Sequence, residues 1–379
     1  MDPTIRRNVV ISAVNLRKGG TLTVLRDCLG YLSGRKDLHV TALVHRRDLC
    51  DYPGIDYIEI PWSIGSWFKR LKCEYITMHR ISRQLPETDL WFSLHDTTPR
   101  VVAKRQAVYC HTSFPFMKPT WQDFRMDAKI PLFSMFTRFA YRWNVRKNRY
   151  LVVQSQWMRK GMAALLHLPE DRFIVFPPAF RSLPIPSIPL ASPPVFLFPS
   201  TPDVHKNFET LCEAARLLEE RLGRKRFRVI ITVKGNENQY AKWLHEKWGD
   251  VQSIDFQGLM SRDNLARAYG EAACLVFPSR AETWGLPISE FIPTGKPIIL
   301  ADLPYAHETA AGASRVAFIP ARDARALASA MESFLNGNLQ EFHPVAIPSF
   351  EPPYASDWDA LFQLLLSHGR DGGKPANHV

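Results

Sequence analysis

The chain has 379 residues, of which 46% are hydrophobic and 22% are charged, a composition typical of folded globular proteins, and its length predicts two domains. No apolar run is long enough to span a bilayer, and no secretory signal pattern precedes the first predicted strand. The six scattered cysteines form no C-x-x-C pair, which favours buried thiols in a reducing cytoplasm over disulfides or a zinc site.

The charge is unevenly distributed along the chain. Residues 1–190 contain 29 Lys and Arg against 15 Asp and Glu, a net charge of +14, whereas residues 191–379 have a net charge of −3. A basic first half indicates an anionic partner, which is a nucleic acid, an acidic bilayer or a phosphorylated substrate. A solvated basic surface without a specific partner is the alternative.

The first half alternates strand and helix patterns. Strands are predicted at 8–13, 40–44, 107–110 and 150–153, and a helix at 21–32, where apolar residues recur at helical spacing. Gly19 and Gly20 lie in the loop between the first strand and this helix. Paired glycines let the backbone approach a ligand closely, and a helix N-terminus favours negative charge, although a plain loop explains them equally. The G-x-G-x-x-G dinucleotide fingerprint is absent.

Polar residues follow two further strand patterns in this half. His111 comes directly after 107–110, where it is placed to donate a hydrogen bond to a sugar hydroxyl or to transfer a proton. Asp96 follows the apolar run 90–92, where it orients a hydroxyl or caps a turn. A structural role is the alternative for both residues.

Two segments of the first half interleave aromatic and basic residues, at 67–80 and 132–149. Such helices lie in a membrane interface, or they are ordinary amphipathic helices that cover a core. Nucleic-acid binding also uses aromatic residues among basic ones, but neither segment forms a recognisable DNA- or RNA-binding motif.

A proline-rich joint separates the halves, with nine prolines between residues 177 and 202. After it the alternation resumes, with strands predicted at 195–198, 227–233, 254–256, 273–277, 297–300 and 316–319. The chain therefore reads as an α/β protein with two Rossmann-like parallel-sheet domains that face a cleft. The predicted units are a first domain at 1–180, a linker at 181–194, a second domain at 195–350, and a C-terminal helix and tail at 351–379. The apolar face of that helix needs a partner surface, for which the first domain is a candidate.

The second half carries a lysine and two glutamates at the predicted ends of strands. Lys206 follows the strand 195–198 and is placed to hold a phosphate at the start of the next helix. Glu282 follows the strand 273–277, and Glu290 lies one turn into the helix after it, with Gly285 between them. Ligands bind at the carboxyl ends of the strands in open α/β sheets, so these residues indicate a site for a polyhydroxylated, phosphate-bearing molecule. Ordinary surface residues remain the alternative.

Taken together, these segments resemble the family 4 retaining glycosyltransferases of the GT-B fold, over residues 8–335. The family signature E-x-F/W-G-x-x-x-x-E is matched by Glu282, Trp284, Gly285 and Glu290. The segment 294–299 matches the G-x-P-hydrophobic strand of the family. The glycine loop, the histidine and the Lys-Asn pair described above also fall where the family has them. The segments 93–99, 111–116 and 200–207 look most like the bacterial branch that builds O-antigen and other surface polysaccharides.

The resemblance implies roles for the second domain. Glu290 binds the nucleotide ribose and Lys206 the diphosphate. Glu282 and the amides of Gly285 and Leu286 bind the hydroxyls of the donor sugar. No metal and no cofactor are expected, because the departing phosphate itself deprotonates the acceptor on the same face and the anomeric configuration is retained.

For the first domain, the resemblance implies that Gly19 and Gly20 approach the diphosphate and that His111 contacts the sugar near its C6 position. Asp96 is the candidate on the acceptor side. The family commonly has a Gly-Arg pair after the first strand of the second domain, where this chain has Ser200 and no arginine. Either Lys206 holds the diphosphate alone, or Arg280 or Lys234 substitutes for the missing arginine.

The implied function is transfer of a hexose, with mannose or rhamnose favoured, from a nucleotide sugar whose expected nucleotide is GDP. The implied acceptor is a lipid-linked or growing glycan of a bacterial surface polysaccharide. The enzyme is expected in the cytoplasm, in peripheral contact with the anionic inner face of the membrane and without a nucleic-acid partner. The alternatives are a non-catalytic nucleotide- or nucleic-acid-binding protein and a nucleotide-sugar 2-epimerase.

Overall fold

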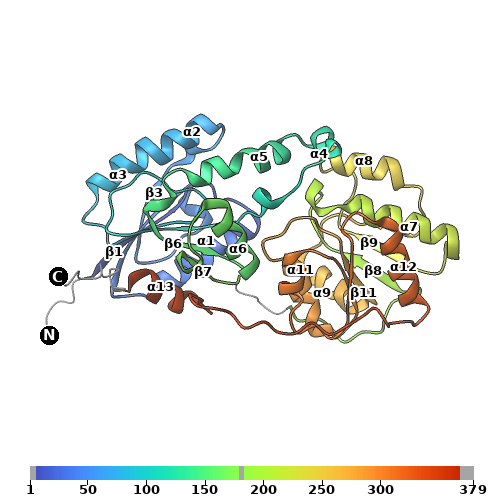
Figure 1. Cartoon of the computed structure of the whole chain (residues 1–379). Coiled ribbons are helices and arrows are strands. Elements are labelled where there is room, and N and C mark those ends of the chain that lie inside the picture. The colour runs from blue at the N-terminus through green and yellow to red at the C-terminus, as the bar shows by residue number, and fades with distance from the viewer. Residues whose placement is uncertain (1–5, 179–182, 368–379) are drawn as a thin grey trace, which may run out of the picture.

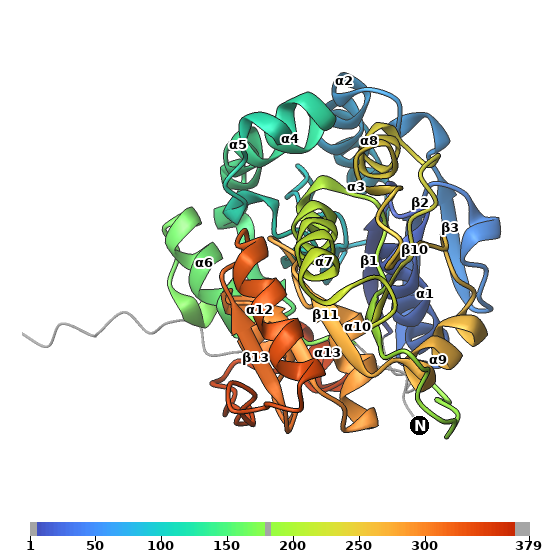
Figure 2. The ribbon, with the colours of Figure 1, turned by 90° about the vertical axis from the view of Figure 1, so that its right-hand side faces the viewer.

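The computed structural model describes residues 6–178 and 183–367 and contains two parallel β-sheets side by side, each covered by helices on both faces (Figures 1 and 2). The two predicted Rossmann-like sheets are thus confirmed. Residues 181 and 182 of the predicted linker and residues 368–379 of the predicted tail lie outside the described residues.

The first sheet has seven strands in the order β3-β2-β1-β4-β5-β6-β7. Its strands are β1 Arg7–Ala13, β2 Leu38–Val44, β3 Ile55–Glu59, β4 Leu90–Ser93, β5 Gln106–Tyr109, β6 Asn148–Val153 and β7 Phe173–Val175. The side chains of β1 alternate between two cores: Val9 and Ile11 pack under one face of the sheet and Val10 under the other. Burial on both faces explains why the strand reads as a continuous apolar run.

The second sheet has six strands in the order β10-β9-β8-β11-β12-β13. Its strands are β8 Val195–Phe198, β9 Arg228–Ile231, β10 Ile254–Phe256, β11 Cys274–Phe277, β12 Ile298–Ala301 and β13 Val316–Ile319. Every strand predicted from the sequence is present. The unpredicted β3 and β7 are an edge strand with exposed positions and a strand of three residues, so neither has a strong periodic pattern.

Helices of the first domain are α1 Gly19–Ser33, α2 Trp67–Lys72, α3 Met78–Gln84, α4 Trp121–Met126, α5 Lys129–Arg142 and α6 Gln156–Leu166. Those of the second are α7 Phe208–Leu222, α8 Gln239–Trp248, α9 Arg262–Glu271, α10 Leu286–Phe291, α11 Pro304–Thr309 and α12 Ala324–Leu335. None of the helices in the described residues combines the length and apolar character that a membrane crossing requires.

The last helix, α13 Trp358–Leu366, packs on the first domain although it follows the second in sequence (Figure 1). The ring of Phe362 lies 5.6 Å from that of Tyr31 and 6.1 Å from that of Phe92. The segment that leads to the helix forms a bridge between Tyr354 and Val175 of β7. The chain therefore crosses between the domains a second time and ties the end of the second domain to the sheet of the first.

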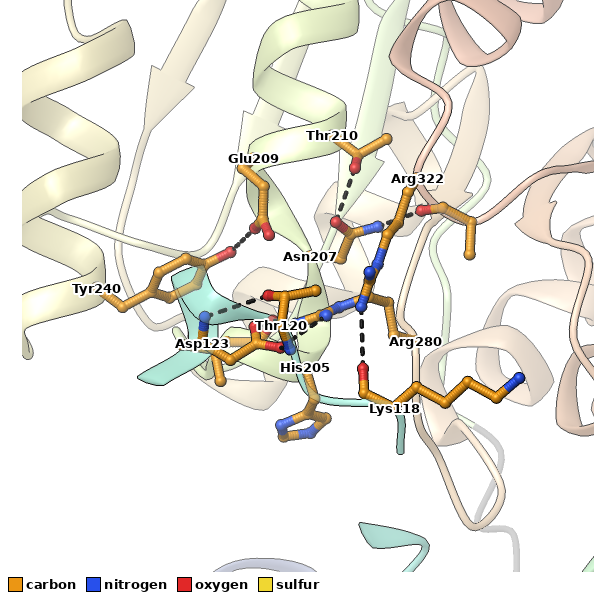
Figure 3. Close-up of polar contacts among 12 residues, drawn as sticks. Lys118, Thr120, Asp123, His205, Asn207, Glu209, Thr210, Tyr240, Arg280 and Arg322 are labelled. Carbon is orange, nitrogen blue, oxygen red and sulfur yellow. Dashed lines mark hydrogen bonds and ion pairs between the residues drawn. The ribbon is translucent and has the colours of Figure 1, made fainter. Parts of the chain in front are cut away.

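A buried ion pair joins the two domains near the top of Figure 1, where α4 reaches toward α7 and α8. The guanidinium of Arg280, in the loop after β11, donates to the carboxylate of Asp123 in α4, with an Nη1–Oδ2 distance of 3.0 Å (Figure 3). The two side chains are 6% and 3% exposed. Thr120 and Asp123 also form a capping box at the start of α4, which aims the carboxylate at its partner.

Replacing Asp123 with Ala is expected to lower the free energy of unfolding by about 3 kcal/mol, because it leaves the Arg280 guanidinium buried without a counter-charge. The measurement is urea-induced unfolding followed by circular dichroism. Thr120→Ala is the matched control, since it removes only the cap and should cost about 1 kcal/mol. Equal losses in both variants would show that the ion pair contributes nothing beyond the cap.

The Asp123–Arg280 pair also predicts how the stability of the protein depends on pH. Burial by itself raises the pKa of Asp123, but Arg280 and the hydrogen bonds with Thr120 together more than offset burial, and the pKa is lowered from 3.8. The stabilisation is therefore fully present above pH 3.8 and is lost only as the pH falls through the lowered value. We expect the stability difference between the native chain and Asp123→Ala to be constant from pH 5 to 8, and a pH series of the urea experiment measures it.

Candidate functional site

A cavity of about 450 Å³ lies between the domains, at the carboxyl ends of the strands of both sheets. Eight of its lining residues come from the first domain, up to and including Pro178; Gly20, His111 and Gln154 are among them. The remaining lining residues come from the second domain. In each sheet the strand order reverses between the first and fourth strands of the domain, β1 and β4 in one sheet and β8 and β11 in the other. The cavity adjoins these topological switch points. The predicted cleft thus exists.

A lysine and a glutamate of the second domain meet in the wall of the cavity. Lys206 follows β8 and Glu282 follows β11, and because these strands are neighbours the two side chains come together. The Lys206 Nζ lies 2.6 Å from the Glu282 Oε1, and the side chains are 15% and 12% exposed. The pair gives the cavity a cation and a carboxylate whose charges balance, with further acceptor capacity left on the carboxylate.

The turn between Glu282 and α10 depends on a glycine. Gly285 has a φ of 92°, and a Cβ there would lie 3.2 Å from the Cδ1 of Ile288, so any other residue is both strained and crowded. The turn brings Thr283, Trp284 and Leu286 into the wall of the cavity.

Glu290 also lines the cavity, and α9 fixes its carboxylate. The Tyr269 hydroxyl donates a hydrogen bond of 2.9 Å to the Glu290 Oε2. Burial raises the pKa of Tyr269, and the neighbouring Glu290 raises it further, so the phenol keeps its proton and remains the donor. Glu290 is therefore an oriented carboxylate with its other oxygen available to a ligand.

His111 faces this wall from the first domain, in the loop after β5. Its backbone N–H donates to the Asp96 Oδ1 at 2.5 Å, and its ring packs 4.2 Å from that of Tyr109. Burial lowers its pKa, and its buried Nε2 has no protein partner among the described residues. The imidazole is thus neutral at pH 7, and a residue that lines the cavity keeps a buried ring nitrogen without a partner among the described residues.

Asp96 does not itself line the cavity. Its backbone has a φ of 68°, and its carboxylate holds the His111 loop. The structure therefore places this predicted acceptor-side residue behind His111.

The predicted glycine loop lies on the first-domain side. Gly19 begins α1 with a φ of 64°, and Gly20 lines the cavity, with no side-chain cap at the start of the helix. A Cβ at either position would meet nothing within 4 Å, so the backbone here is open toward the cavity.

The two substitutes that the sequence offered for the missing arginine lie elsewhere. Arg280 is committed to Asp123 and to the carbonyl of Val204, and neither Arg280 nor Lys234 is among the lining residues. The sequence could not predict this placement of Arg280, because its partner Asp123 belongs to the other domain.

Residues that the sequence did not single out complete the lining, including Asp27, Gln154 and Arg262. Arg262 is the first residue of α9 and is exposed beside the cavity. Its position after the predicted strand 254–256 was the one signal that could have indicated it. Within the described chain, no group of three His, Cys, Asp or Glu side chains is arranged to hold a metal ion.

Residues 186–343 match the family model described as "Glycosyl transferases group 1". A curated relative, O-antigen chain mannosyltransferase B of Escherichia coli, is 26% identical over 181 residues. That alignment covers 45% of this chain, and the chain spans about half of the relative's length (47%).

Several solved glycosyltransferases have the same fold. WaaG, a glycosyltransferase involved in lipopolysaccharide biosynthesis, has a TM-score of 0.61 at 15% identity and covers 86% of this chain and 90% of its own. Alr3699/HepE of Anabaena, solved with UDP-glucose, has a TM-score of 0.60 at 14% identity and covers 95% of both chains. The galactosyltransferase WaaB of the lipopolysaccharide outer core has a TM-score of 0.59 at 14% identity, with 88% and 91% covered. These likenesses establish the GT-B arrangement.

Gly285→Ala is expected to lower the free energy of unfolding by about 1–2 kcal/mol, because alanine is strained at this φ and crowds Ile288. Gly337→Ala is the matched control, since Gly337 has a φ of 74° but open space around its Cβ position. The extra loss at Gly285, measured by urea unfolding, is the cost of crowding. A smaller loss at Gly285 than at Gly337 would contradict this account of the turn.

Proposed function

We propose that this chain, which through its second domain belongs to the group 1 glycosyl transferases and has the GT-B fold, transfers a hexose from a nucleotide sugar with retention of configuration. The carrying observation is the set of facing groups in the cavity. The Lys206–Glu282 pair and the oriented Glu290 line the second-domain side of the cavity, and His111, whose buried Nε2 has no partner among the described residues, lines the first-domain side.

In this proposal the second domain holds the donor. Glu290 accepts hydrogen bonds from the ribose hydroxyls, and Glu282 and the Leu286 amide bind the sugar. The Lys206 ammonium faces the diphosphate, whose negative charge grows as the glycosidic bond breaks. The Gly19–Gly20 backbone contributes from the first domain, since it is open toward the cavity.

The reaction breaks the bond between the anomeric carbon and the diphosphate oxygen and forms a bond to the acceptor oxygen on the same face. The acceptor proton passes to the departing phosphate oxygen, so no carboxylate nucleophile is required. The neutral His111 accepts or donates a hydrogen bond to a sugar hydroxyl through Nε2, which otherwise has no partner.

For the substrates we propose a GDP-linked mannose or rhamnose as the donor and a lipid-linked or growing surface polysaccharide as the acceptor. The similarity to an O-antigen chain mannosyltransferase supports this choice. The charge of +14 over residues 1–190 supports an anionic acceptor at the inner face of a membrane. We propose no nucleic-acid partner.

A donor panel tests the proposal. Purified protein is incubated with GDP-mannose, GDP-rhamnose, UDP-glucose and UDP-galactose, with and without acceptor glycolipid, and release of nucleoside diphosphate is measured. We expect turnover with a GDP sugar and an α-anomeric product from an α-linked donor by proton NMR. Conversion of the donor to its 2-epimer without acceptor would indicate an epimerase, and the absence of binding to every donor would sink the enzyme assignment.

Glu282→Ala and Glu290→Ala are each expected to reduce transfer at least a hundredfold, because each removes a carboxylate that faces the donor. Glu246→Ala is the matched control, since the Glu246 side chain is 62% exposed and, among the residues that the structure describes, pairs only with Lys242 at 3.7 Å. Thermal unfolding verifies that the variants fold. Near-normal turnover in both site variants would refute the site.

Lys206→Met is expected to lower kcat about a hundredfold or more while changing the donor Kd less, because the ammonium interacts most strongly with charge that develops in the transition state. Lys242→Met serves as control, since Lys242 lies on the exposed face of α8. An unchanged kcat with a weakened Kd would assign Lys206 to binding alone.

A further inference from the structure

A second cavity, of about 670 Å³, lies in the first domain between α2, α5 and the turn 114–116. Eight of its ten lining residues are apolar, including Trp67, Phe133 and Phe136. We call it the aromatic groove. Its size is that of a small-molecule site, and its lining offers almost no hydrogen-bonding groups.

The aromatic side chains of the groove are organised but unburied. Phe133 contacts Trp67 with a centroid distance of 5.9 Å and Phe114 at the same distance. Trp67 is 54% exposed and Phe136 is 59% exposed. Large apolar side chains gathered at one exposed place mark a surface that an apolar partner covers.

The groove adjoins the donor cavity. Phe114 lines the groove and stands three residues after His111, which lines the donor cavity. The Phe114 ring also packs edge-on 5.1 Å from the ring of His205, the neighbour of Lys206. Phe114 thus connects the groove to the segment that carries Lys206 and, along the chain, to the loop of His111.

The wall formed by α2 is held in place from inside the domain. Arg70 donates to the Glu74 carboxylate at 2.8 Å and to the carbonyl of His95 at 2.8 Å, next to Asp96. The Arg70 guanidinium also lies 5.9 Å from the centre of the Trp67 ring. The groove is thus preformed, and its wall is connected to the loop that positions His111.

The two segments that contribute α2 and α5 to the groove are rich in cations. Residues 61–84 and 117–149 contain 13 Lys and Arg but only three Asp and Glu. Two of these three acids are turned inward, since Glu74 pairs with Arg70 and Asp123 with Arg280. The groove is therefore complementary to a molecule with an apolar chain and an anionic head.

We propose that the aromatic groove binds the single apolar chain of a phosphate-bearing lipid acceptor and places its head group at the donor cavity. The inference rests on the proposed function, and it adds the place in the fold where the lipid of the acceptor binds. The lipid chain covers the exposed aromatic side chains, so that both are removed from water. The neighbouring cations hold the phosphate.

The test measures binding of monomeric geranylgeranyl diphosphate, below its micelle concentration and without nucleotide sugar, by calorimetry. We expect saturable binding at one site. Phe136→Ser should weaken it about tenfold, because it removes an apolar ring from the groove. Ala140→Trp, which fills the groove from α5, should weaken binding by at least as much.

Phe139→Ser is the matched control. Phe139 lies on the same helix and is 54% exposed, close to the 59% of Phe136, but it does not line the groove. We expect the affinity of the Phe139→Ser variant for the lipid to stay within twofold of that of the native protein. Inorganic diphosphate, which lacks the chain, should bind at least tenfold more weakly than the lipid.

Three outcomes overturn the inference. The first is no saturable binding of the lipid, and the second is equal weakening of that binding by Phe136→Ser and Phe139→Ser. The third is a dimer in light scattering that Phe136→Ser dissociates into monomers. Equal loss of binding to phosphatidylglycerol vesicles in the two Phe variants, without lipid binding in solution, would assign the surface to the bilayer instead. Binding of GDP-mannose, measured separately, tests the proposed function, so the two failures are distinguishable.

Discussion

The shape of the donor cavity depends on the buried ion pair between Asp123 and Arg280. An unpaired charge at either position would cost several kcal/mol, so the two groups have to meet when the domains assemble. Arg280 stands two residues before Glu282, and the pair therefore fixes the loop that carries a principal residue of the site. Figure 3 shows how the cluster draws α4 of the first domain against the second domain.

The other end of that loop is held by the first domain as well. The Ser155 hydroxyl donates to the carbonyl of Thr283 at 3.2 Å. Beside it, the Glu308 carboxylate accepts the N–H groups of Gln156 and Trp157 at the start of α6, at 2.7 and 3.0 Å. A carboxylate at a helix N-terminus is stabilised by the helix dipole. Any rotation of the domains therefore moves the donor-binding loop, which couples the geometry of the site to the distance between the domains.

Much of the fold could be predicted from the sequence because its signals are local. Apolar runs such as Val195–Phe198 are buried strands, and Lys206 and Glu282 follow strands that the parallel topology places side by side. Side-chain partners across the domains could not be predicted, since nothing near Arg280 in sequence indicates Asp123.

The aromatic and basic segments illustrate a second limit. Helical spacing in 132–149 permits both a core helix and an interfacial one, and the structure contains features of each. Tyr141 and Ser134 of α5 are buried, whereas Phe136 and Phe139 on the same helix are exposed. Periodicity identifies the faces of a helix but not what covers them. The buried face of α5 carries Pro131, Ser134, Thr137 and Tyr141, whereas Phe136 and Phe139 stay exposed. Much of the apolar surface of this helix therefore lies outside the core of its own domain, where the proposed lipid chain would cover Phe136.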